Sequence, residues 1–146
     1  MKSAQKITRV QLKINQEDEI FLLGIVSAEP DYKLSLSINK KLRISLKNIS
    51  PIKITEDAGS EMVFSRFSDI SGSPGIMYTL VSNRSSKYFL LKKLKNVDYI
   101  FLLHTSEDES DTDRISSAMR EIESVNAVFI VDIKSLKDKK LQYLTR

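Results

Sequence analysis

Cysteine is absent from this chain of 146 residues, and histidine occurs only once. Without cysteine there are no disulfide bonds, thiolate metal ligands or cysteine nucleophiles. Long apolar runs are also missing, because stretches such as residues 99–103 fall far short of the ~20 residues that cross a bilayer. The first six residues lack the apolar segment of a signal peptide. These absences predict a cytoplasmic protein that does not engage a membrane.

The composition is that of a globular domain. Hydrophobic residues make up 41% of the chain and charged residues 29%, which is too apolar for a disordered protein. A chain of this length hides roughly two-thirds of the surface that it exposes when unfolded, so it has a sizeable core. We therefore expect residues 1–146 to form a single domain.

The polarity pattern predicts six strands, at residues 7–14, 43–49, 62–70, 76–82, 97–103 and 125–133. Residues 88–91 are a candidate for a further short strand. Residues 71–75 hold two glycines and a proline between two apolar runs, which predicts a hairpin loop. Residues 51–61 contain proline, glycine and acids, and predict an exposed connection. Residues 97–103 are nearly all apolar, as expected of a strand that is covered on both faces.

Three helices are predicted. Asn15 and the acidic residues after it are typical of a helix start, and this helix should end near Ala28 because Pro30 cannot continue it. Its buried face would include Ile20, Phe21, Leu23 and Val26. Residues 31–42 fit either a strand or one helical face, and a capping Asp31 with basic residues at the far end favours a helix.

The clearest helix covers residues 112–124. Ser110 and Asp113 have the spacing of a helix cap, and apolar residues follow at helical spacing, so Ile115, Met119 and Ile122 should be buried. Together these elements predict an α+β fold, with a single mixed or mainly antiparallel sheet of about five to six strands packed against two or three helices. A ferredoxin-like core is compatible with this order, although the spacing does not establish it.

Several short stretches resemble the IPExxxVDY family of bacterial proteins. They lie at residues 23–25, 30–34, 38–40, 97–99, 127–129 and 136–139. The Val97-Asp98-Tyr99 stretch matches the second half of the family name, whereas Leu91-Lys92-Lys93 stands where the name has Ile-Pro-Glu. The resemblance implies a single-domain bacterial protein. It implies no activity, cofactor or site residue.

Three patterns in the sequence partly resemble a catalytic base, a calcium-binding loop and a phosphate-binding loop. His104 would need a nucleophile and an orienting acid to act as a general base, and the spacing identifies neither. Alternating acids at residues 107–113 lack the glycine and glutamate of a calcium loop, so they are better explained as the start of a helix. A phosphate loop leads into a helix and places a lysine near the phosphates. Gly72 and Gly75 are instead followed by a strand pattern, and no lysine comes before Lys87. We expect no catalytic residue, metal or cofactor.

The best candidate site is a basic segment at residues 84–95. Its cations are Arg84, Lys87, Lys92, Lys93 and Lys95, and they are interleaved with Tyr88 and Phe89. Basic and aromatic residues together suit phosphates and bases. The alternative is an edge strand whose lysines discourage pairing with other strands.

The charge distribution leads to the functional hypothesis. The basic segment contains no acid, and residues 107–113 contain five acids and no base. Such opposed segments attract one another across an interface. We therefore expect a non-catalytic protein that acts through protein–protein contact or self-association, with another protein or a homo-oligomer as partner. The alternative hypothesis is weak RNA or DNA binding by the basic segment.

Overall fold

The computed structural model describes residues 19–56, 59–69, 76–105 and 110–145. Its centre is an antiparallel sheet in the order β3-β4-β5-β8-β2-β9, and a small second sheet pairs β6 with β7. The main elements are β2 (Glu19–Ser27), α2 (Asp31–Leu42), β3 (Lys47–Thr55), β4 (Glu61–Asp69), β5 (Ile76–Ser82), β8 (Tyr99–Thr105), α3 (Ser110–Arg120) and β9 (Val125–Val131). The shorter ones are β6 (Arg84–Ser85), β7 (Tyr88–Phe89), η1 (Lys92–Leu94), α4 (Ile133–Leu136) and α5 (Leu141–Thr145). The predicted α+β fold is confirmed. No helix in the described ranges is long and apolar enough to cross a membrane.

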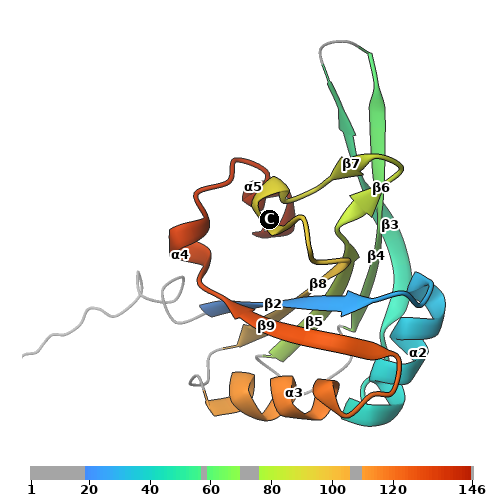
Figure 1. Cartoon of the computed structure of the whole chain (residues 1–146), viewed down its shortest axis with the longest axis vertical. Helices are drawn as coiled ribbons and strands as arrows, with labels where there is room; N and C mark the ends of the chain where they lie inside the picture. The colour runs from blue at the N-terminus through green and yellow to red at the C-terminus, as the bar shows by residue number, and fades with distance from the viewer. Residues whose placement is uncertain (1–18, 57–58, 70–75, 106–109, 146) are drawn as a thin grey trace, which may run out of the picture.

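The two longer helices cover one face of the sheet, and the short C-terminal helices lie on the other (Figure 1). Strands β5, β8, β2 and β9 lie side by side in that order, and β8 and β2 are antiparallel to each neighbour. With α2 and α3 on one face, this is the split β-α-β order of a ferredoxin-like core. Strands β3 and β4 form an inserted hairpin that rises beyond the rest of the sheet (Figure 1).

The sheet separates two hydrophobic clusters. The first lies beneath the long helices and includes Leu34 and Ile38 from α2, with Ile115 and Met119 from α3. The second lies under the segment after β5 and under α4 and α5. Strand β8 contributes to both, because alternate residues point to opposite faces. The prediction that residues 97–103 contain a strand covered on both faces is confirmed.

The predicted helix from Asn15 to Ala28 is wrong. Residues Glu19–Ser27 form β2, which lies between β8 and β9. Leu22 enters one hydrophobic cluster, while Leu23 and Ile25 enter the other. A central strand that is buried on both faces shows no polar–apolar alternation, so its apolar run resembles that of a buried helix.

Residues 31–42 form a helix, as favoured by the sequence. α2 ends at Arg43, which adopts a left-handed conformation with φ of 58° and whose N–H donates to the Asn39 carbonyl. The side chain of Asn39 then bonds both backbone groups of Leu46, at 2.7 and 3.2 Å. These bonds hold the loop that follows α2.

The predictions for residues 43–49 and 51–61 were wrong in their boundaries. The strand starts only at Lys47 and continues through Pro51 to Thr55, where an exposed connection had been expected. Proline is tolerated because β3 is an edge strand and its register with β4 shifts between Ile49 and Ile52. A proline has no N–H to donate to a neighbouring strand, and neither a loop nor the outer side of an edge strand requires that hydrogen bond. Pro51 is therefore compatible with both positions.

The remaining predictions were closer. β4 and β5 pair as an antiparallel hairpin, although its loop lies outside the described residues. Of residues 88–91, only Tyr88 and Phe89 form a strand. α3 ends at Arg120, yet Ile115, Met119 and Ile122 are all buried as predicted. The strand predicted at residues 7–14 lies outside the described residues.

Candidate functional site

The basic segment is folded around one buried asparagine. Asn83 is fully buried, and its Nδ2 donates to the carbonyls of Leu94 and Val97, each at 2.9 Å. Its Oδ1 accepts the N–H of Leu91 at 2.8 Å. Leu90 and Leu91 are buried in the second hydrophobic cluster. The Asn83 side chain therefore fixes the backbone conformation of the segment through three hydrogen bonds. Nothing in the sequence around Asn83 predicts this role.

Two of the five predicted site residues are engaged within the fold. Arg84 Nε donates to Asp98 Oδ1 at 2.7 Å, and the guanidinium lies 4.8 Å from the centroid of the Phe89 ring. Lys93 Nζ donates to the carbonyl of Leu136, the last residue of α4, at 2.6 Å. These two cations hold the segment to Asp98, the residue before β8, and to α4.

The other three predicted site residues face solvent. Lys87, Lys92 and Lys95 are exposed, and Lys87 Nζ lies 5.7 Å from the centroid of the Tyr88 ring. The side chains of Lys92 and Lys95 make no hydrogen bond or ion pair with a described residue. The segment therefore exposes these three lysines to solvent, and its binding role stays a prediction.

The acidic segment is only partly described, because residues 107–109 lie outside the described ranges. Asp113 is exposed on α3, which packs on the opposite face of the sheet from the basic segment. Within one chain, α3 with Asp113 and the basic segment therefore lie on different sides of the sheet (Figure 1). Among the residues with described positions, no three potential metal-ligating side chains come together.

A pocket of about 480 Å³ lies on the sheet face that also carries α5. Its lining residues come from four strands, the loop before β3 and α5, namely Ser45, Lys47, Ile49, Ile52, Arg66, Ser68, Asp69, Met77, Thr79, Val81, Leu102, His104 and Leu144. The strand register explains this grouping: Thr79 pairs with Ser68 on one side and Leu102 on the other, and Met77 pairs with His104. No pattern in the sequence predicts the pocket, because its residues follow ordinary strand alternation in separate segments.

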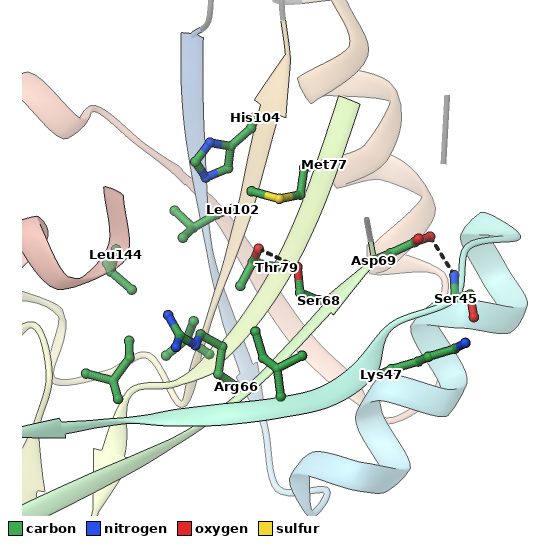
Figure 2. Close-up of a pocket in the computed structure, with 13 residues that line it drawn as sticks. Ser45, Lys47, Arg66, Ser68, Asp69, Met77, Thr79, Leu102, His104 and Leu144 are labelled. Atoms are coloured by element: carbon green, nitrogen blue, oxygen red, sulfur yellow. Dashed lines mark hydrogen bonds between the residues drawn. The ribbon is translucent and has the colours of Figure 1, made fainter. Parts of the chain in front are cut away.

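The polar groups of the pocket are partly held by the protein. Arg66 Nε donates to the Ser50 carbonyl at 2.9 Å, and the Ser68 and Thr79 hydroxyls lie 3.3 Å apart. Asp69, at the end of β4, accepts the Ser45 N–H at 2.7 Å (Figure 2). His104 is half-buried at one end of the pocket beside Met77 (Figure 2).

Among the strands that the structure describes, the two at the edges of the large sheet, β3 and β9, differ in chemistry. β3 carries Lys47, Lys53 and Pro51, together with a register shift. β9 carries no charged residue and no proline, and Phe129 and Ile130 are 50% and 52% exposed. Lysine, proline and bulges are the features that prevent an edge strand from pairing with another chain. β3 has all three, whereas β9 has no lysine or proline and shares only the last feature, a register shift with β2 between Val26 and Ser27.

A comparison of the sequence with protein-family models and with curated proteins finds no match to either. The resemblance to the IPExxxVDY family therefore stays a prediction.

Proposed function

We propose that this protein is non-catalytic and acts by self-association, with β9 of one copy pairing with β9 of a second. The observation that carries the proposal is the uncharged edge strand with two half-exposed apolar side chains, Phe129 and Ile130. An edge strand presents backbone N–H and C=O groups that a further strand can pair. Apolar side chains beside such groups gain stabilisation when a partner covers them.

A second copy suits this edge because two identical strands pair antiparallel about a two-fold axis, which closes the assembly at a dimer. Phe129 and Ile130 are neighbours in β9, so they lie on opposite faces of the sheet. Pairing would extend the sheet and cover both faces at once. The charged segments, which first suggested an interface, are not needed for this contact.

One group opposes the pairing. Arg120 Nη2 donates to the carbonyl of Val128 at 3.2 Å, which places a cation beside β9. A carbonyl oxygen can accept two hydrogen bonds, so a second strand would share or displace this one. Removing the arginine side chain should therefore strengthen the association.

Sedimentation of the full chain tests the proposal. The expected species has twice the chain mass of 16.7 kDa and persists at high salt, because an apolar contact is not screened. The double variant Phe129→Lys, Ile130→Lys should be a folded monomer. Val63→Lys is the matched control, since Val63 is 41% exposed on β4, away from both edges.

A monomeric wild type at high concentration would overturn the proposal. So would a dimer that survives the double lysine variant or dissociates equally in Val63→Lys. The cytoplasmic location expected from the sequence is part of this proposal and is checked by cell fractionation. Nucleic-acid binding by Lys87, Lys92 and Lys95 is the second candidate, favoured by the exposure of these lysines.

A further inference from the structure

The pocket on the sheet has the size and lining of a small-molecule site. Its volume of about 480 Å³ lies within the roughly 300–1,000 Å³ that is usual for ligand pockets. Most of the exposed lining surface is apolar, and four of the apolar lining residues are Ile52, Val81 and Leu102 from strands and Leu144 from α5. These four belong to the second hydrophobic cluster, so the pocket wall is continuous with the core. Burying an apolar ligand body here is favourable.

Arg66 supplies a positive charge at this apolar surface. It is half-buried on β4, and the bond from its Nε to the Ser50 carbonyl leaves both terminal amino groups for another acceptor. No ion pair joins it to a residue with a described position. The planar end of an arginine matches a carboxylate, with which it forms two parallel hydrogen bonds.

The other charged groups indicate a ligand with one negative charge. Lys47 points away from Arg66, toward Ser45 (Figure 2). Asp69 is buried and accepts the Ser45 N–H, so it occupies the same end of the pocket as Lys47. Arg66, in contrast, pairs in register with Val81, so it lies in the apolar part of the pocket wall.

We propose that this pocket binds a small organic acid with an apolar body, whose carboxylate pairs with Arg66 and whose chain lies against Ile49, Met77 and Leu144. This site is independent of self-association, because its strands are β3, β4, β5 and β8, whereas the edge strand β9 lies beyond β2. Met77 at the far end is unbranched and adapts to ligands of different length.

The single histidine makes the test specific. His104 lines the pocket and is the only histidine of the chain, so its ring resonances in an NMR spectrum are unambiguous. The probe is decanoate, a straight-chain carboxylate, added to the full-length protein. We expect saturable shifts of the His104 resonances. The uncharged alcohol 1-decanol should bind about tenfold more weakly or worse, because it cannot form the charge-assisted pair with Arg66.

Two variants complete the test. Arg66→Gln should weaken decanoate binding about tenfold or more, and Arg66→Lys should weaken it less, because it keeps the charge without the planar fork. Arg114→Gln, on α3 and the opposite face of the sheet, is the matched control and should bind like the wild type. The proposal is overturned if decanoate leaves His104 unshifted at millimolar concentration, if decanol binds equally well, or if folded Arg66→Gln binds like Arg114→Gln.

Discussion

Arg84 and Asp98 form an ion pair that ties the basic segment to the central sheet. Arg84 Nε lies 2.7 Å from Asp98 Oδ1, and the other carboxylate oxygen accepts the N–H of Ser27 at 2.9 Å. One aspartate thus joins β6 to the end of β2. The sequence predicts that Arg84 binds a partner. Its ion pair with Asp98 also gives it a structural role within the fold.

Replacing Asp98 with alanine tests that role. The buried N–H of Ser27 loses its acceptor and Arg84 loses its partner, so the free energy of unfolding should fall by about 1–3 kcal/mol. Urea unfolding measures the change. Glu123→Ala, at an exposed acid after α3, is the control and should be close to neutral. Equal stability of the two variants would contradict the structural role.

Gly24 and Val97 are in close contact, which predicts a rescue. A Cβ atom at Gly24 would lie 2.8 Å from a methyl carbon of Val97, which is itself buried. Gly24→Ala should therefore cost roughly 1–3 kcal/mol through overpacking. In the double variant with Val97→Ala the clash is gone, so thermal or urea unfolding should show a smaller loss than the sum of the single changes. Simple additivity would refute the contact.

Tyr99 predicts a loss of stability at alkaline pH. Burial, with further contributions from Asp31, Asp98 and Glu29, raises the pKa of Tyr99 from 10.0 to about 12. Its hydroxyl donates to the Glu29 carbonyl. As the pH rises, the Tyr99 hydroxyl loses its proton in the unfolded chain before it does so in the folded one. The contribution of Tyr99 to the free energy of unfolding is therefore complete below pH 10 and disappears as the pH rises to about 12.

The measurement is the difference in unfolding free energy between the wild type and Tyr99→Phe across that pH range. The wild type should be more stable at neutral pH, and its advantage should shrink between pH 10 and 12. Tyr32→Phe removes an exposed hydroxyl and should give a flat difference. A constant advantage for Tyr99 would show that its proton is not linked to folding.

The exposed lysines predict how nucleic acid would bind. Three phosphate contacts, by Lys87, Lys92 and Lys95, give a slope of log affinity against log salt of about −2 for single strands. We expect the wild type to bind nucleic acid only weakly, so its affinity should change little in the double variant Lys92→Glu, Lys95→Glu. The control pair is Lys33→Glu, Lys40→Glu, on two exposed residues of α2. Sub-micromolar RNA binding with that slope, lost only in the first variant, would favour the nucleic-acid hypothesis.

Local patterns determined part of this protein. The apolar spacing in α3, and the acidic start and basic end of α2, act over a few residues and were interpreted correctly. The boundaries of β9 were also close, with residues 125–133 predicted and Val125–Val131 observed. Its register with β2 shifts at Val26 and Ser27, so the side chains beyond the shift no longer follow the alternation that begins at Val125.

Long-range pairing decided the rest. β2 became a strand because β8 and β9 flank it, and its sequence alone fits a buried helix equally well. Lys93 joins a carbonyl 43 residues away, and the pocket collects side chains from β3 to α5. Which strand is an edge, and therefore whether Phe129 is exposed, follows from strand order. Polarity within one segment carries no information about strand order, because order depends on which distant segments pair.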